Sequence, residues 1–169
     1  TIFSKAYGKD ARGKPPTMQS YVHIASITKT FTSQLLFKLR DAGLVHLDDP
    51  VSKYFPDFAI HSPFRTTSPI TLRQLATHTS GIPRDLPYPC GFGPQACNET
   101  GALAMLSNMH LVVPPYTRFH YSNIGSALLG RTLEKAAGKP YDTLLQREIL
   151  TPLGINGTTI IDSASVAKM

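Results

Sequence analysis

The most constraining feature of the sequence is an apolar repeat that begins just after residue 26 and stops before a glycine. Its members recur at steps of three and four residues: Ile27, Phe31, Leu35, Leu36 and Leu39. This spacing places side chains on one face of an α-helix. A glycine such as Gly43 is typical of a helix C-terminal cap. The pattern therefore predicts an amphipathic helix that opens at Ser26 and packs its apolar face against a core.

A serine and a lysine stand at the start of this helix, in the order Ser26-Ile27-Thr28-Lys29. Spaced this way, Ser26 and Lys29 share a helical face, so the amine can act on the hydroxyl. The helix N-terminus also presents free N–H groups and the positive end of the helix dipole, which favour an oxyanion. The tetrapeptide therefore suggests a nucleophile and its base. A bare Ser-x-x-Lys match also occurs by chance, so its context must support it.

A second polar cluster, Tyr121-Ser122-Asn123, precedes another predicted helix. The apolar positions of that helix include Ile124, Leu128, Leu129 and Leu133. At a loop-to-helix junction, a Tyr hydroxyl can transfer protons and an Asn amide can bind a substrate carbonyl or amide. The simpler alternative is that Ser122 or Asn123 caps the helix.

These clusters, with residues 78–83 (His-Thr-Ser-Gly-Ile-Pro) between them, resemble successive landmarks of the serine β-lactamase and penicillin-binding-protein-like family. The similar branch is the class C β-lactamase-like one, whose second motif is Tyr-x-Asn. The resemblance covers nearly the whole chain in the right order, which is more specific than either short motif. It implies an α+β, β-lactamase/transpeptidase-like fold. The chain is expected to be an N-terminal fragment, comprising the helical lobe and a remnant of the antiparallel sheet.

The resemblance also implies a domain organisation. Residues 1–24 would be the sheet remnant, with a strand at 1–8, and the approach to the active-site helix. Residues 25–156 would be the helical lobe that carries Ser-x-x-Lys and Tyr-x-Asn, and residues 157–169 would return toward the sheet.

Local signals predict further short helices within the lobe. Asp49 would cap one with Pro50 at its first position. Thr71 and Gln74 fit a capping box for a helix that ends near His78. Residues 101–109 and 140–150 complete the set, and residues 80–100, rich in Pro and Gly, predict a long loop.

By resemblance, the chain is a serine hydrolase that works through an acyl-enzyme on a lactam, ester or peptide-like carbonyl. Ser26, Lys29 and Tyr121 are the expected catalytic residues, and Asn123 is expected to orient the acyl group. No cofactor or metal is expected. The expected partners are a small-molecule or peptide-like acyl substrate and the remainder of the parent chain.

Two departures from the family pattern matter. Relatives usually carry a third motif, Lys-Thr-Gly or His-x-Gly, on a strand lining the cleft, and neither tripeptide occurs in the 169 residues. That strand would supply a second oxyanion N–H, whose loss costs on the order of 3 kcal/mol, or a hundredfold in rate. The chain alone is therefore expected to hydrolyse substrate poorly. Relatives also often have Pro-Gly where this chain has Pro115-Tyr116, and Tyr tolerates a positive φ poorly.

Two other function classes stay open. One is a non-catalytic interaction or scaffold protein on the same fold, because fold does not determine function. The other is a helical binding module unrelated to hydrolases, in which Ser26 and Tyr121 would lie far apart.

Cysteine and asparagine positions bear on the cellular location. Cys90 and Cys97 flank a turn-rich loop and favour a disulfide, with two free cytosolic thiols as the alternative. Asn98 and Asn156 each begin a glycosylation sequon. Together these features favour a secreted or lumenal glycoprotein, with the bacterial periplasm as the alternative.

The charge of the chain, +6 with 17 basic residues, does not indicate nucleic-acid binding, because those residues are scattered along the sequence. No stretch approaches the roughly 18 uninterrupted apolar residues of a membrane-spanning helix. Neither nucleic acid nor a membrane span within this chain is expected.

Overall fold

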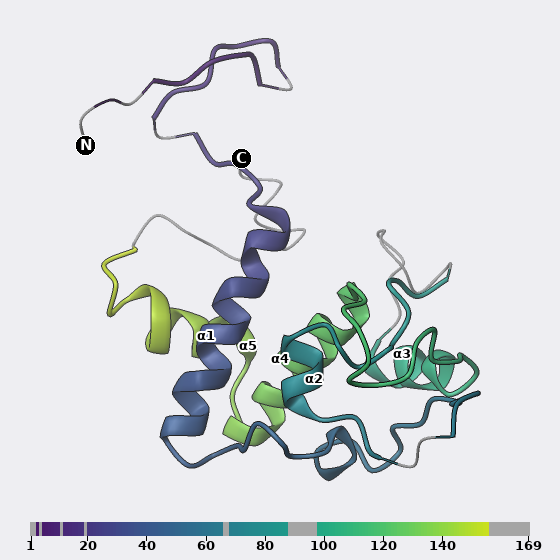
Figure 1. Cartoon of the computed structure of the whole chain (residues 1–169). Helices are drawn as coiled ribbons and strands as arrows, with labels where there is room; N and C mark the ends of the chain where they lie inside the picture. Colours follow the sequence, from purple (N-terminus) through teal and green to yellow (C-terminus); the bar gives the residue numbers. More distant parts are fainter. Residues whose placement is uncertain are drawn as a thin grey trace. The chain divides into compact units, whose positions relative to one another are not determined.

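The structure is a computed structural model that describes residues 3, 5–10, 12–18, 20–65, 68–87 and 98–155. The chain divides into two compact units. The smaller combines Thr1–Thr28 with Thr159–Met169, and the larger is Lys29–Thr158. In the larger unit, short and long helices alternate with extended loops (Figure 1).

Helices are the regular elements of the described chain. They are α1 (Thr28–Asp41), α2 (Leu72–Ala76), α3 (Glu99–Leu106), α4 (Asn123–Ala137) and α5 (Tyr141–Leu145). Short 3-10 turns form at Ala25–Ile27 and Val51–Lys53, and a π-helical turn, Gln146–Leu150, extends α5. In the part of the chain that the structure describes, extended pairing is limited to isolated bridges. The described residues of the strand expected at 1–8 form no strand, because none of the described residues pairs with them.

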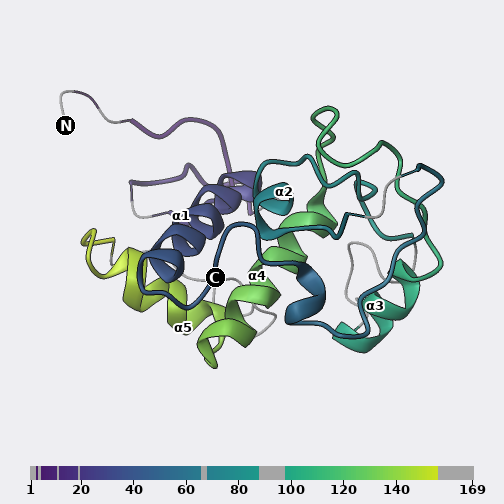
Figure 2. The same cartoon turned by 60° about the horizontal axis from the view of Figure 1, so that its bottom comes forward.

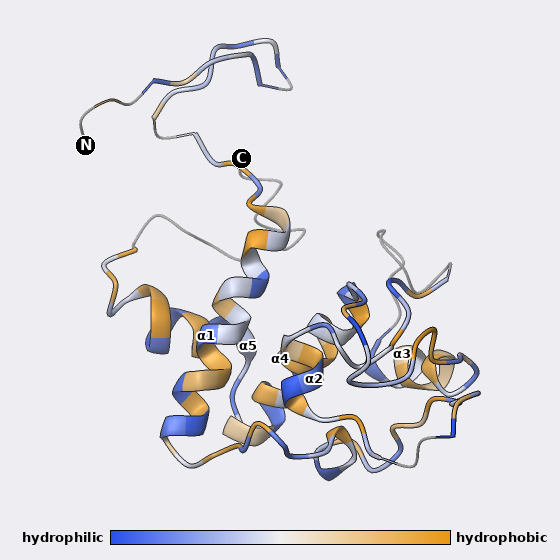
Figure 3. Cartoon of the chain, viewed as in Figure 1, coloured by the Kyte–Doolittle hydropathy of each residue, from blue (hydrophilic) through white to orange (hydrophobic). Residues whose placement is uncertain are grey.

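The core of the larger unit is built by the apolar faces of α1, α2 and α4. Leu35, Leu36 and Leu39 of α1 are buried, as their spacing predicts. Helix α2 packs on α4, and α4 packs on α5. In α1 and α4, apolar and polar residues alternate along each helix, so that apolar residues recur about once per helical turn (Figure 3). Ile27 departs from the prediction: it lies in the 3-10 turn before α1 and is 60% exposed.

Helix α1 lies beside α5 in both views of the chain (Figures 1 and 2). Phe31 of α1 packs against the apolar cluster formed by Leu145, Ile149 and Leu150. Nearby, the Thr32 and Tyr141 hydroxyls are 2.7 Å apart and share a hydrogen bond. These contacts fasten the helix that carries Lys29 to the C-terminal part of the unit.

Helices α1 and α4 both end in a glycine with a left-handed backbone. Gly43 has φ 74 and Gly138 has φ 61. After each glycine, the next N–H turns back to a carbonyl of the last helical turn, from Leu44 to Leu39 and from Lys139 to Glu134. This is the Schellman motif, which satisfies carbonyls that the helix leaves unpaired. The predicted role of Gly43 is confirmed.

The predictions for the short elements had mixed outcomes. The capping box is confirmed, because Thr71 and Gln74 exchange side-chain to backbone bonds. The prediction that Asp49 caps a helix is wrong, since the 3-10 turn begins at Val51 with Pro50 at its N-cap. The Asp49 carboxylate instead accepts hydrogen bonds from the His46 backbone and the Lys53 and Tyr54 side chains.

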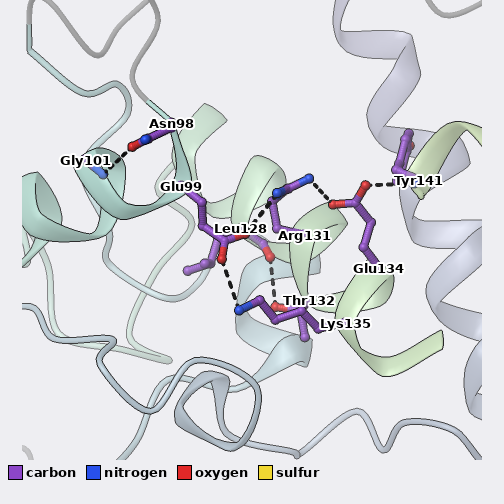
Figure 4. Close-up of polar contacts among 9 residues, drawn as sticks. All are labelled: Asn98, Glu99, Gly101, Leu128, Arg131, Thr132, Glu134, Lys135 and Tyr141. Carbon is purple, nitrogen blue, oxygen red and sulfur yellow. Dashed lines mark hydrogen bonds and ion pairs between the residues drawn. The ribbon is translucent and has the colours of Figure 1, made fainter. Parts of the chain in front are cut away.

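A polar network on the surface joins α3, α4 and α5 (Figure 4). Glu99 of α3 pairs with Arg131 and Lys135 of α4, each at 3.0 Å. Lys135 is the main cause that lowers the pKa of Glu99. Arg131 also pairs with Glu134, which accepts the backbone N–H of Tyr141 at 2.8 Å. The network fixes the ends of α3 and α5 against α4.

Asn98 caps α3, because its side-chain oxygen accepts the Gly101 N–H at 2.9 Å. Replacing Asn98 with Ala should lower the free energy of unfolding by about 1 kcal/mol, whereas Asn98→Asp should preserve it, since Asp caps equally well. Urea unfolding of the three proteins measures the difference. Equal losses in both variants would contradict the capping role. A glycan would attach to the nitrogen of the same amide, which leaves the capping oxygen in place.

Tyr116 adopts φ 65 and so lies in the left-handed region, at the position where the family resemblance predicts glycine. Its N–H donates to the Thr79 carbonyl at 2.9 Å, and its hydroxyl is 3.3 Å from that of Thr71. These bonds hold a backbone conformation that a bulky residue disfavours.

Two substitutions that both remove the Tyr116 ring isolate this strain. Tyr116→Gly should be more stable than Tyr116→Ala by about 1 kcal/mol, because only glycine adopts positive φ freely. At Ala104, an exposed residue within α3, Ala→Gly should have the opposite sign and cost about 1 kcal/mol. Thermal unfolding measures both pairs. If Tyr116→Ala were as stable as Tyr116→Gly, the proposed backbone strain at this position would be refuted.

Candidate active site

Two segments far apart in the sequence, residues 78–84 and 112–123, are joined by backbone hydrogen bonds. The bonds run from Val112 to Gly81, from Tyr116 to Thr79, from His120 to His78 and from Asn123 to Arg84. The approach is close, because a Cβ added to Gly81 would lie 2.1 Å from the Val113 carbonyl oxygen. The glycine of residues 78–83 is therefore a steric requirement. We call these two paired segments the junction.

Ser122 turns into the protein at the start of α4. It is buried, and its hydroxyl donates to the Pro83 carbonyl at 2.7 Å and accepts the Gly125 N–H at 2.9 Å. The alternative that Ser122 caps the helix is thus confirmed. Its backbone is extended, with φ −135 and ψ 117. Across an extended residue, the side chains before and after it point to the side opposite its own. Tyr121 and Asn123 therefore point to the side opposite the Ser122 hydroxyl.

Tyr121 is flanked by two cations. The Lys29 ammonium lies 5.0 Å from the centre of its ring, and the Arg84 guanidinium lies 5.4 Å from it. Both distances fit cation–π contacts. The structure therefore brings Lys29 of α1 and Tyr121 together, two residues that were predicted as catalytic.

Asn123 is held by an acid that the sequence did not single out. Its side-chain nitrogen donates to Asp85 Oδ1 at 2.7 Å, and Asp85 Oδ2 pairs with Arg84 Nε at 3.2 Å. Because a carboxylate only accepts hydrogen bonds, the amide must face it with the NH2 group. Asn123 therefore presents its carbonyl oxygen on the other side.

Ser26 lies in the smaller unit, in the 3-10 turn Ala25–Ile27. The predicted helix start at Ser26 differs from the structure by two residues: α1 begins at Thr28, directly after the 3-10 turn that contains Ser26. Ala25, directly before Ser26, has φ 45 and is strained for a residue with a Cβ. Strained backbone of this kind is concentrated at functional sites.

Three other predicted positions lie where the structure gives no description. Cys90, Cys97 and Asn156 lie outside the described residues, so the disulfide and that sequon stay predictions. Among the residues that are described, no group of three or more His, Cys, Asp or Glu could hold a metal ion. Within the same residues, no helix is long and apolar enough to cross a membrane.

Comparison with known proteins identifies the family. The sequence profile of the family described as Beta-lactamase matches residues 1–168. The chain belongs to the beta-lactamase family. The β-lactamase-like fold expected from the sequence is confirmed by a beta-lactamase/D-alanine carboxypeptidase from Yersinia pestis, solved with citrate. That structure has a TM-score of 0.75 and 36% identity, and the match covers 94% of this chain and 46% of that one.

Curated relatives agree with this assignment of a hydrolase family. Beta-lactamase-like protein 2 of Dictyostelium discoideum is 45% identical over 91% of this chain and 29% of its own length. The D-alanyl-D-alanine-carboxypeptidase/endopeptidase AmpH of Escherichia coli is 40% identical over 94% of this chain and 42% of its own length. This beta-lactamase family chain thus spans less than half the length of either relative, which fits the expected fragment of the fold.

Sequence reasoning missed Arg84, Asp85 and His78 as site residues. All three follow α2, in or directly after residues 78–83, which the family resemblance had already marked. Their partners are distant, since 38 residues separate Asp85 from Asn123 and 44 separate His78 from Ser122. Sequence spacing carries no signal for such pairs, because local periodicity reports only on neighbours within one element.

The cap at Ser122 yields a stability prediction. Ser122→Ala should lower the free energy of unfolding by about 2 kcal/mol, because it removes a cap and leaves the buried Pro83 carbonyl without its donor. Ser126→Ala is the matched control: Ser126 lies inside α4 and only donates to the Ser122 carbonyl at 3.2 Å. It should change stability by about 0.5 kcal/mol or less. Urea denaturation distinguishes the variants, and equal effects would contradict the assignment.

Proposed function

We propose that this chain carries the nucleophile, the base and the proton carrier of a serine acyl hydrolase. Ser26 is the nucleophile, Lys29 the base and Tyr121 the proton carrier. The observation that supports this most directly is the Lys29–Tyr121 contact, which joins the two motifs at 5.0 Å. Neither motif alone would predict that contact, since the residues come from α1 and from the segment before α4.

The reaction follows from these roles. Lys29 acts as the base in its neutral amine form, after the ammonium has released a proton to water. The Ser26 hydroxyl then attacks a carbonyl carbon, and its proton passes to the Lys29 amine, directly or through Tyr121. The same groups return that proton to the leaving nitrogen or oxygen as the acyl bond breaks, which leaves an acyl-enzyme. Water then attacks the ester, and Ser26 regains its proton. Positive charge from Lys29 and Arg84 stabilises a phenolate that forms on Tyr121 during transfer.

Asn123 would bind the acyl group of the substrate. Because Asp85 fixes the amide with its oxygen outward, Asn123 offers an acceptor. An acyl group with an N–H donor, such as a peptide-like amide, therefore suits the site better than one that presents only a carbonyl. The names of AmpH and of the Yersinia protein, both linked to D-alanine carboxypeptidase activity, favour the same peptide-like class.

The cellular setting is part of this proposal. A secreted or lumenal location, a Cys90–Cys97 disulfide and glycosylation of Asn98 or Asn156 all remain predictions. Weak turnover by this chain alone is also predicted, because its sequence lacks the third motif that supplies an oxyanion donor in the family.

Acyl trapping tests the nucleophile. The 169-residue chain and a longer protein that continues it through the third motif are each incubated with a fluorophosphonate or β-lactam probe. Mass spectrometry then locates the adduct. We expect an adduct on Ser26 of the longer protein, and a rate lower by a hundredfold or more in the short chain, since one oxyanion donor is worth on the order of 3 kcal/mol.

Ser26→Ala is the negative control, and Ser33→Ala, elsewhere on α1, should leave labelling unchanged. The proposed hydrolase function would be contradicted if the folded longer protein gave no adduct, or if it were labelled equally after Ser26→Ala. The first of these outcomes would favour the non-catalytic interaction protein on the same fold.

A further inference from the structure

Helix α2 ends in the same motif as α1 and α4, but with a histidine in place of the glycine. His78 has φ 56, close to the values at Gly43 and Gly138. The His78 N–H donates to Leu75, and the Thr79 N–H turns back to the Gln74 carbonyl at 3.0 Å. A histidine pays a steric cost in this conformation that a glycine avoids. The ending of the helix therefore does not explain the side chain.

The imidazole of His78 makes the contacts that a glycine would lose. Its Nδ1 accepts the backbone N–H of Ser122 at 3.2 Å. Its ring lies 4.6 Å from the Tyr121 ring, at an interplanar angle of 36°. The Phe119 ring meets it edge-on at 5.5 Å. One side chain thus contacts the proposed proton carrier and the residue that links it to Asn123.

The bond to Ser122 determines the protonation state of the ring. An N–H donor at Ser122 requires a lone pair on Nδ1, so the proton of the neutral imidazole sits on Nε2. Tyr121 lies against the His78 ring, and the charge of Lys29 from α1 acts on it. Arg84 lies against the same Tyr121 ring. Burial, and then the positive charge of Lys29, lower the pKa of His78 below its ordinary value of 6.5.

We propose that His78 is a positioning residue for the Tyr-x-Asn motif. Its neutral ring holds the Ser122 backbone and the Tyr121 ring, and protonation at Nδ1 releases the motif by placing one donor against another. The part of this proposal that concerns catalysis rests on the proposed function, whereas the structural part does not.

The proposal gives the junction a pH dependence. Because the pKa of folded His78 lies below that of the unfolded chain, the unfolded state binds more protons below about pH 6.5. The stability that the neutral ring contributes is complete above that pH and is lost as the pH falls through the folded pKa.

Nitrogen-15 NMR of the 169-residue chain tests the structural part without any substrate. Spectra of the imidazole and of the Ser122 amide are recorded from about pH 8 to about pH 5, across the usual range of histidine titration. We expect the Nε2–H tautomer at high pH, and a Ser122 amide shift that follows the titration of His78. A proton on Nδ1 at high pH, or a Ser122 shift that ignores the titration, would overturn the proposal.

Two variants separate positioning from a helix-ending role. His78→Asn tolerates positive φ and places an acceptor oxygen near the position of Nδ1, so the Ser122 amide should keep its bond and stop titrating. His78→Gly suits the backbone best but lacks the ring. If the residue only ended α2, the glycine variant would equal or exceed the original chain in every measurement.

In the longer protein, labelling of Ser26 gives the catalytic readout. We expect His78→Gly to keep its thermal midpoint, because glycine relieves the positive-φ strain and so offsets the lost ring contacts. We expect it to lose acylation rate on the order of a hundredfold, the usual effect of a misplaced catalytic group. We expect a smaller loss for His78→Asn, together with loss of the acid limb that His78 contributes to the pH profile. Unchanged labelling in His78→Gly would refute positioning. If neither the original longer protein nor any variant is labelled, the proposed hydrolase function is refuted. The NMR result alone then decides the role of His78.

Discussion

The site depends on the backbone pairing that joins residues 78–84 to residues 112–123. This pairing brings the end of α2 against the start of α4, and it tolerates no side chain at Gly81. It also orients Ser122 inward, so that Tyr121 and Asn123 lie on the opposite side. The end of α2 and the start of α4 are each capped, and their pairing holds the polar side chains of the site in place.

Backbone strain marks the same places. Within the described residues, the non-glycine residues with positive φ are Ala25, His78 and Tyr116. Two of them belong to the paired segments and the third precedes Ser26. Glycine would remove the strain at each position, so the side chains retained at His78 and Tyr116 are better explained by what they contact. His78 contacts Ser122 and Tyr121, and Tyr116 reaches Thr71.

Local features of the fold could be predicted from the sequence, and distant pairings could not. The apolar face of α1, the stop at Gly43 and the capping box at Thr71 each depend on residues within one or two turns, and all three are confirmed. Asp49 was assigned wrongly because its carboxylate binds other donors: the backbone N–H of His46 and the side chains of Lys53 and Tyr54. Within the site, the motif residues were predictable from the family pattern, but their partners Asp85 and His78 were not, because tertiary packing alone brings them to Asn123 and Ser122.

The charged side chains around the junction form a chain of contacts from Lys29 through Tyr121 and Arg84 to Asp85. Arg84 contacts the Tyr121 ring and also pairs with Asp85, so part of its charge is balanced before a substrate arrives. Asp85 in turn is held on one oxygen by Arg84 and on the other by Asn123. Lys29 contacts the Tyr121 ring, whereas in the proposed function Asp85 would affect substrate recognition by orienting the Asn123 amide. In the proposed mechanism, proton transfer at Lys29 and Tyr121 is thus separate from acyl-group selection at Asp85 and Asn123, although only Ser122 lies between Tyr121 and Asn123 in the sequence.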